Sequence, residues 1–208
     1  PRLTSLVDGR QFDTVYHEHF SYFSLHSARS VLERSGLEIY DVEELPTHGG
    51  SLRIYAHHRR TGKNSVAPSV SSILDFESSR GVRTIHYYGN LQGSAEASKN
   101  DLLEFLINVK AQGQSIAGYG AAAKGNTFLN FAGVRGDLLP YVVDASPSKI
   151  GKFLPGSRIP VIDEQAIRES RPDFVLVLPW HLAPEIAHQL SYIREWSGRF
   201  VTAVPALR

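Results

Sequence analysis

The amino-acid sequence predicts an α/β fold in which a parallel sheet fills the C-terminal part of the chain. Over roughly the last hundred residues, short apolar runs alternate with segments of helical periodicity, and this alternation is typical of parallel strands joined by helices. The first of these runs opens into a glycine-rich stretch, as the first strand of a Rossmann-like domain does. Earlier in the chain, a helical pattern is followed by two strand patterns. That order resembles the closing section of another doubly wound α/β domain whose last strand runs antiparallel.

The composition sets bounds on the function. The chain has 208 residues, of which 42% are hydrophobic and 21% are charged, as in ordinary globular domains. The 22 basic and 21 acidic residues nearly cancel; because duplex binding normally requires a concentrated basic face, we expect no nucleic-acid partner. The absence of cysteine excludes disulfides and thiolate-bound zinc within this chain. No signal peptide and no long apolar run is present, so we expect a cytoplasmic protein without a membrane partner.

The first section, residues 1–62, is expected to close an α/β domain. Apolar side chains share one face of a helical segment over residues 27–35, and Gly36 follows where a helix C-terminus favours glycine. Residues 37–45 alternate apolar and polar side chains, as half-buried strands do. Residues 50–58 predict a second strand with the same alternation. The sequence also begins at Pro1 and contains no methionine, so we expect it to be part of a longer protein.

Residues 63–112 are expected to form linking helices, and residues 113–208 a Rossmann-like domain. The clearest helical stripe covers residues 101–111. In the last section, apolar runs predict strands and periodic segments predict helices. The expected strands are residues 115–119, 139–143, 172–178 and 200–204, and the expected helices are residues 164–170 and 184–195.

The glycine-rich stretch lies where the first strand of the last section turns into a helix. Gly118, Gly120 and Gly125 allow the backbone to approach a ligand, and a helix N-terminus offers N–H groups and a positive dipole end to phosphate. Lys124 adds a cation and Asn126 a polar side chain beside it. The spacing matches neither the dinucleotide fingerprint nor the P-loop. The stretch therefore predicts a phosphate or nucleotide contact, although a tight turn without a ligand gives the same pattern.

An acidic residue follows the next expected strand. Asp144 comes about twenty residues after the glycine stretch, where folds of this kind often place a carboxylate on a ribose. Lys149 follows in a loop at the same edge of the sheet. We interpret both as candidate substrate-binding residues, while a solvated loop is the alternative.

The segment Tyr16-His17-Glu18-His19, with Tyr22 nearby, is the most reactive run in the chain. Histidine exchanges protons near neutral pH, a carboxylate can orient it, and a tyrosine hydroxyl can stabilise an oxyanion. Two other readings remain open: a buried polar network, or a metal site at a spacing unlike that of common zinc motifs.

A second glycine turn enters the strand expected at residues 50–58. Arg53 could bind a phosphate or carboxylate there, and His48 could assist. The alternative is a hairpin turn that carries an exposed arginine.

Five segments together resemble the S-adenosylmethionine (SAM)-dependent sugar C-methyltransferases of deoxysugar biosynthesis, which act on dTDP-linked keto-sugars. The resemblance runs in order along nearly the whole chain, so it is more specific than any single motif. The segments are FDTVYHEHFSYFSL, LPTHGGSLRIY, GYGAAAKGNTFLNF, VVDASPSKIGKFLPG and VLVLPW.

The resemblance implies three parts: a zinc-binding module, a central SAM-binding domain of the class I methyltransferase type, and a C-terminal Rossmann-like domain. The zinc cysteines and the SAM glycine loop are absent from this sequence. We therefore expect residues 1–62 to be the C-terminal part of the SAM-binding domain, with most of the SAM pocket and all of the zinc outside this chain. Residues 113–208 would then bind the nucleotide sugar, and this chain alone would be inactive.

The resemblance also assigns roles. His19 is the candidate base, with Tyr16 and Glu18 as its partners, and it would remove a proton beside the sugar ketone to give an enolate. Tyr16 or Tyr22 would donate to the enolate oxygen. Lys124 and its glycine loop would hold the nucleotide diphosphate, with no metal in this chain.

One departure and two alternatives accompany this hypothesis. After Trp180 the family usually has asparagine, whereas this chain has His181, which puts the choice of substrate in doubt. The main alternative is a nucleotide-binding Rossmann domain of an oxidoreductase, with NAD at the glycine stretch. The other is a metal-dependent hydrolase that uses His17, Glu18 and His19. The sugar, the methylated carbon, the base and the oligomeric state stay open.

Overall fold

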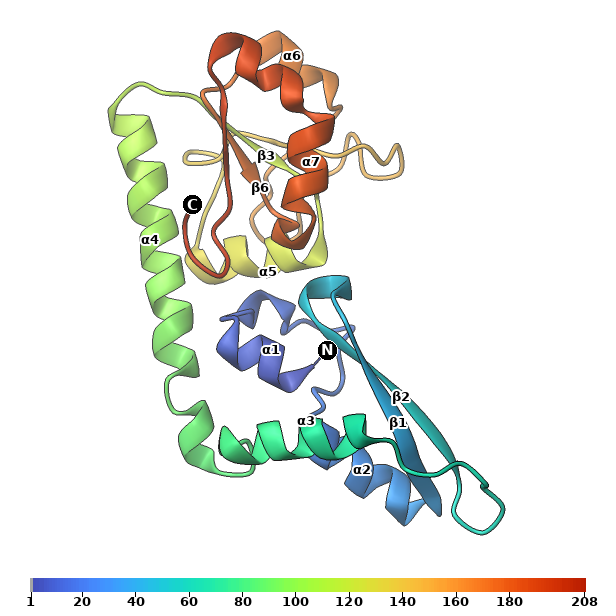
Figure 1. The fold of residues 1–208 in the computed structure, drawn as a ribbon. Coiled ribbons are helices and arrows are strands. Elements are labelled where there is room, and N and C mark those ends of the chain that lie inside the picture. Colours follow the sequence, from blue (N-terminus) through green and yellow to red (C-terminus); the bar gives the residue numbers. More distant parts are fainter. Residues whose placement is uncertain (1) are drawn as a thin grey trace. The chain divides into compact units, whose positions relative to one another are not determined.

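The computed structural model describes residues 2–208. The chain divides into two compact units. The first contains residues 2–11 and 17–92, and the second contains residues 12–16 and 93–208. Figure 1 labels the helices and strands of both units. None of the helices formed by residues 2–208 is long and apolar enough to cross a membrane.

The first unit is built from short helices and one hairpin (Figure 1). Ser24 begins α2 because its side chain accepts a hydrogen bond from the Ser27 backbone in a capping box. Gly36, with a φ of +74°, follows the end of α2 in the left-handed conformation that glycine tolerates best. The helices are α1 (Leu3–Asp8), α2 (Leu25–Arg34), α3 (Pro68–Ser79) and the 3₁₀ turn η3 (Ile85–Tyr88).

The hairpin consists of β1 (Leu37–Leu45) and β2 (Ser51–His58), joined by the 3₁₀ turn η2 (Thr47–Gly49). The strands pair antiparallel, with an irregularity in register between Ile39 and Asp41. Their buried side chains pack with α2 and α3 in one core, and this apolar burial holds the unit together. The predicted order of helix, strand, turn and strand is confirmed. That the hairpin closes a larger SAM-binding domain stays a prediction.

The second unit contains a five-stranded parallel sheet in the order β5-β4-β3-β6-β7. Relative to their order along the chain, the strands are arranged 3-2-1-4-5, which is the Rossmann arrangement. The Rossmann-like α/β fold predicted for this part is therefore confirmed. The strands are β3 (Ile116–Tyr119), β4 (Val142–Val143), β5 (Val161–Ile162), β6 (Phe174–Val177) and β7 (Arg199–Val201).

Helices cover both faces of this sheet. Apolar residues of α4 and α5 share one core with Phe174 and Leu176 of β6. Residues of α6 and α7 share a second core with Val175 and Val177. Since successive residues of a strand point to opposite faces, the two cores lie on opposite sides of the sheet. The elements are α4 (Leu91–Ala111), α5 (Ala123–Ala132), α6 (Gln165–Ser170), α7 (Ala183–Gln189), η4 (Trp180–Leu182) and η5 (Ser191–Trp196).

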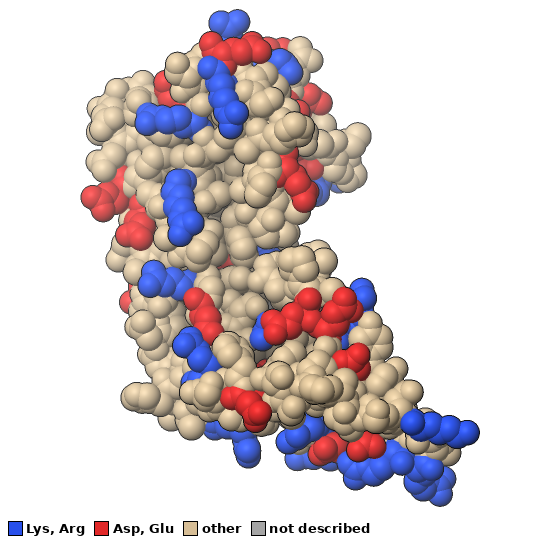
Figure 2. Space-filling model, in the orientation of Figure 1, with Lys and Arg blue, Asp and Glu red and all other residues tan. Residues whose placement is uncertain are grey.

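One short segment from early in the chain belongs to the second unit. The 3₁₀ turn η1 (Phe12–Thr14) packs against α5, with the Phe12 ring 5.0 Å from Phe128 and 5.1 Å from Phe131 between centroids. On the visible face of each unit, acidic and basic side chains are interspersed (Figure 2), in keeping with the formal charge of +1.

Candidate functional site

The glycine stretch brings the start of α5 to the carboxyl edge of the sheet. Gly120 follows β3 with a φ of +87°, and a Cβ atom there would lie 2.6 Å from Cδ of Pro179. A Cβ on Gly125 would lie 2.5 Å from Cβ of Leu178, and one on Gly118 would lie 2.8 Å from Cγ2 of Val142. All three distances are shorter than real Cβ contacts. Each glycine therefore allows a close approach that a larger residue would prevent.

This edge is also the topological switch point of the sheet. β3 lies between β4 and β6, so its connection and the connection of β6 run toward opposite sides of the sheet. Ligands of open α/β sheets bind in the crevice outside the carboxyl ends at such a point. The first N–H groups of α5 face that region without acceptors inside the helix, and the helix dipole makes this end attractive to anions.

Asp144 braces the glycine loop. Its Oδ2 accepts hydrogen bonds from the Ala121 backbone at 2.8 Å and from Lys149 Nζ at 2.9 Å, and its Oδ1 accepts one from the Ser146 backbone at 2.8 Å. Burial raises its pKa, but Lys149 and the two backbone N–H groups outweigh burial and leave the pKa below its usual range. The carboxylate thus ties two loops together, and a ribose contact for it stays a prediction.

A groove of about 370 Å³ opens beside this loop. Phe153, with 64% of its surface exposed, presents an aromatic ring there, and Lys149 and Lys152 supply positive charge. Such a combination of ring, cations and apolar floor suits a nucleotide, whose base stacks while its phosphates seek cations. The lining residues are Ala121, Ser148, Lys149, Lys152, Phe153, Leu154, Pro155 and Val161.

Lys124 lies in α5 but is almost completely buried, with 5% of its surface exposed. Its Nζ lies 4.7 Å from the ring centroid of Trp180, within cation–π range. Burial lowers the pKa of Lys124, and the negative charge of Asp13 opposes that effect. Lys124 is therefore positioned under the carboxyl edge and not extended into solvent. Asn126 is half-buried, and its side-chain oxygen accepts a hydrogen bond from Asn130 at 3.2 Å.

Asp13 is a residue of this site that the sequence analysis missed. It is 1% exposed, and its Oδ2 accepts a hydrogen bond from Trp180 Nε1 at 2.7 Å. Burial raises its pKa, while the Trp180 hydrogen bond and the charge of Lys124 lower it. The two bonded residues are 167 positions apart, so no local pattern could have indicated the contact.

The run from Tyr16 to His19 spans the boundary between the two units along the chain. Tyr16 belongs to the second unit, and the residues that follow belong to the first. The side chains of His17 and Glu18 are 87% and 70% exposed and lie 4.0 Å apart. The rings of His19 and Tyr22 lie 6.3 Å apart and nearly perpendicular. Among residues 2–208, no three His, Asp or Glu side chains are arranged to hold a metal ion.

His48 and Arg53 lie on the hairpin of the first unit. His48 has a φ of +56° inside η2, a conformation more often found in turns than in regular elements. Arg53 Nη1 lies 3.0 Å from Oε2 of Glu43 across the two strands, and both side chains are about half exposed. Arg53 is therefore engaged in an exposed cross-strand ion pair, and a substrate role for either residue stays a prediction.

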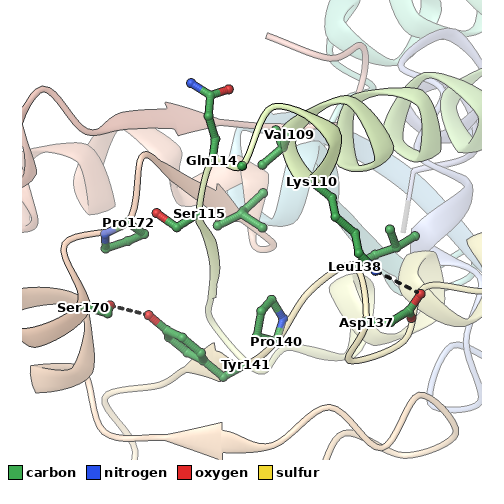
Figure 3. Close-up of a pocket in the computed structure, with 12 residues that line it drawn as sticks. Val109, Lys110, Gln114, Ser115, Asp137, Leu138, Pro140, Tyr141, Ser170 and Pro172 are labelled. Carbon is green, nitrogen blue, oxygen red and sulfur yellow. Dashed lines mark hydrogen bonds and ion pairs between the residues drawn. The ribbon is translucent and has the colours of Figure 1, made fainter.

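A second cavity of the same domain lies at the amino ends of the strands (Figure 3). It has a volume of about 280 Å³ and is lined by Gln114, Ser115 and Pro172, among others. Its lysine, Lys110, pairs with Asp137 at 4.0 Å. This cavity has one lysine, which already faces a carboxylate. The groove at the carboxyl edge has two: Lys149, which pairs with Asp144 at 2.9 Å, and Lys152, so it offers more positive charge to a phosphate.

Comparisons with known proteins identify the family of the chain. The chain matches the family model of the C-methyltransferase C-terminal domain over residues 46–205. The C-methyltransferase NovU of Streptomyces niveus is 36% identical to it over 208 residues, which are 100% of this chain and 49% of NovU. The chain thus spans about half the length of the curated relative that it matches. The family model covers the glycine loop, the groove and Trp180, and the alignment with NovU also includes the run from Tyr16 to His19.

Proposed function

The chain belongs to the family of C-methyltransferase C-terminal domains, and on this basis we propose that it supplies the nucleotide-sugar-binding part of a SAM-dependent C-methyltransferase. The acceptor is a dTDP-linked deoxysugar, and the methylated carbon lies beside its ketone. The observation that carries the proposal is the groove at the carboxyl edge of the sheet, where Lys149, Lys152 and Phe153 lie next to the glycine loop.

Different parts of the nucleotide contact the start of α5 and the groove. The diphosphate lies against the first N–H groups of α5 and the ammonium groups of Lys149 and Lys152. The base stacks on the exposed ring of Phe153, a contact worth roughly 1–3 kcal/mol in other nucleotide complexes. Lys124 adds positive potential from beneath the edge, where the low dielectric strengthens its field.

The proposed chemistry begins with proton removal. A C–H beside a ketone is a weak acid, so the reaction requires a positioned base and a donor for the developing enolate oxygen. His19 takes the proton, with Glu18 and Tyr16 as its partners. Tyr16 or Tyr22 donates to the enolate oxygen, which leaves the adjacent carbon as the nucleophile. SAM supplies the electrophilic methyl group that this carbon receives.

The proposal assigns no SAM pocket to this chain. In this fold class a nucleotide cofactor binds at the carboxyl ends of parallel strands. Among residues 2–208 the parallel strands are those of the second unit, whose carboxyl edge carries the groove assigned to the sugar nucleotide, while the first unit pairs its strands antiparallel. We therefore place the methyl donor, and the zinc of the family's N-terminal module, outside this chain.

One alternative keeps an observation in its favour. The strand order β5-β4-β3-β6-β7 with a glycine turn after β3 is also the arrangement that binds NAD in oxidoreductases. Under that alternative the glycine loop binds NAD and the run from Tyr16 to His19 has no role in the chemistry.

Calorimetric titration of the chain separates the two. We expect saturable heat with dTDP and none with SAM or NAD. Lys149→Ala and Lys152→Ala should each weaken dTDP binding at least tenfold, because each removes a charge-assisted contact worth about 1.5–3 kcal/mol. Lys110→Ala is the matched control, since Lys110 is also exposed and ion-paired but lines the other cavity. Tight NAD binding with no response to dTDP would instead support the oxidoreductase.

A further inference from the structure

The segment Phe12–Tyr16 is the part of the N-terminal sequence that packs on the Rossmann-like domain. Its anchor is partly apolar, because Phe12 packs edge-on against Phe128 and also contacts the Phe131 ring. The backbone then folds back tightly: Val15 N–H donates to the Phe12 carbonyl at 2.9 Å, and Tyr16 N–H donates to the Thr14 carbonyl at 3.1 Å. The position of Tyr16 therefore depends on the position of η1.

The anchor buries the carboxylate of Asp13 at a position where an apolar side chain would cost less free energy to bury. Asp13 is 1% exposed, and its Oδ1 has no hydrogen-bond partner. Burying a carboxylate with an unsatisfied oxygen costs free energy, and replacing buried ionic groups by apolar ones is often neutral or stabilising. Stability alone is thus a weak explanation for an acid at this position.

Asp13 interacts with two residues at the carboxyl edge of the sheet. Trp180, which donates to it at 2.7 Å, follows β6, and Lys124, whose charge acts on it, lies in the first turn of α5. The Lys124 ammonium also lies over the Trp180 ring. Asp13 thus ties η1 to the segment after β6 by a hydrogen bond, and the Lys124 ammonium over the same indole ring links that contact to α5.

We propose that Asp13 is a positioning residue, which fixes the start of the run Tyr16–His19 on the nucleotide-binding domain through Trp180 and Lys124. The inference rests on the proposed function, because it assigns Asp13 a role in holding Tyr16, the partner of the base, on the domain that binds the sugar nucleotide. It does not assign Asp13 a contact with the nucleotide. A loss of this clamp should lower turnover, because misplacing reacting groups by about 1 Å can cost on the order of a hundredfold in rate.

The test compares Asp13→Ala and Asp13→Asn in the complete methyltransferase, with Asp101→Asn on the exposed face of α4 as the matched control. Asp13→Ala removes both the hydrogen-bond acceptor and the charge, whereas Asp13→Asn keeps an oxygen that Trp180 can donate to. We expect Asp13→Ala to lower kcat for methyl transfer by at least tenfold, with KM for the nucleotide sugar and Kd for dTDP changed less than threefold. Asp13→Asn should recover part of the lost kcat, and Asp101→Asn should match the wild type.

A second measurement follows the clamp without activity. The chain has two tryptophans, so the indole N–H signal of Trp180 can be assigned in an NMR spectrum by Trp180→Phe. It should move in both Asp13 variants and stay in place in Asp101→Asn. An unmoved signal, an unchanged kcat, or a rise in Kd for dTDP that matches the fall in kcat/KM would overturn the inference. Failure of the wild-type chain to bind dTDP would instead count against the proposed function.

Discussion

The two segments to which chemistry is assigned are held by their surroundings to very different degrees. The glycine loop before α5 is fixed on several sides: Pro179 and Leu178 pack where Cβ atoms would be, and Asp144 bonds to the Ala121 backbone. The run from Tyr16 to His19 is docked at its first residue, whereas the side chains of His17 and Glu18 are mostly exposed.

This difference teaches where each function should be measured. A binding site that is already formed loses little free energy on ordering, so nucleotide binding should be a property of the second unit by itself. Catalytic groups on an exposed segment require further contacts to reach a productive geometry. Binding and methyl transfer should therefore respond to different substitutions.

The largest expected effect is on turnover. His19→Ala in the complete methyltransferase should lower kcat by about 10²- to 10⁴-fold, which is the usual contribution of a general base. Because His19 is not one of the residues that line the groove, the dTDP affinity of the chain should not change. His17→Ala is the matched control and should retain most of the activity. If His19→Ala lowered the dTDP affinity as well as kcat, binding and catalysis would not be properties of separate segments.

The next effect is on the glycine loop. Gly125→Ala should lower the free energy of unfolding by about 1–3 kcal/mol, because the added Cβ would overlap Leu178. This outcome is opposite to the usual gain when alanine replaces a helical glycine. Gly136→Ala, where a Cβ meets nothing within 4 Å, is the control. Thermal or denaturant unfolding of both variants measures this difference. If Gly125→Ala were as stable as the wild type, the close approach of Leu178 to Gly125 would not contribute to stability.

A smaller effect concerns pH. The pKa of Asp144 lies below its usual range in the fold, despite burial that raises it, because Lys149 and two backbone N–H groups favour the charged form. Its stabilising contribution is therefore complete above the unfolded pKa of about 3.9 and is lost as the pH falls through the folded value. Asp144→Asn should flatten the loss of stability below about pH 4, as measured by urea unfolding across that range. If the free energy of unfolding fell equally steeply with pH in Asp144→Asn, other carboxylates would be responsible for the acid sensitivity.

The smallest effect is expected at the hairpin. Arg53→Ala should leave the unfolding temperature and the dTDP affinity of the chain unchanged, because the pair with Glu43 is exposed and solvent screens it. Glu43→Ala serves as the control for loss of the same pair. If kcat/KM of the complete enzyme fell with Arg53→Ala but not with Glu43→Ala, the arginine would contact substrate directly.

Much of the fold could be predicted because its signals are local. The helix before Gly36, both hairpin strands and the strand–glycine–helix unit at Gly118–Thr127 each carry their own periodicity or capping residues. The strand β5 was missed, since two residues, Val161 and Ile162, are too short to show alternation. The membership of the C-methyltransferase family, which the motifs indicated together, is confirmed.

The site was predictable to a smaller extent. The glycines and Lys149 were indicated by their place after expected strands, and the structure brings Lys149 to Asp144 as their common edge suggested. Three features depended on distant contacts that no sequence window contains: the burial of Lys124, its position over the Trp180 ring, and the hydrogen bond from Trp180 to Asp13. The role of His19 came from the family resemblance, because its spacing alone left several readings open.

The central claim is that the carboxyl edge of the second unit binds the nucleotide, and mapping dTDP by NMR on the isotopically labelled chain tests it most directly. The account predicts that saturating dTDP shifts the amide signals of Ala121, Lys152 and Phe153, while Gln114 and Tyr141 at the opposite cavity keep theirs. Shifts confined to Gln114 and Tyr141, or no shifts at millimolar dTDP, would contradict it.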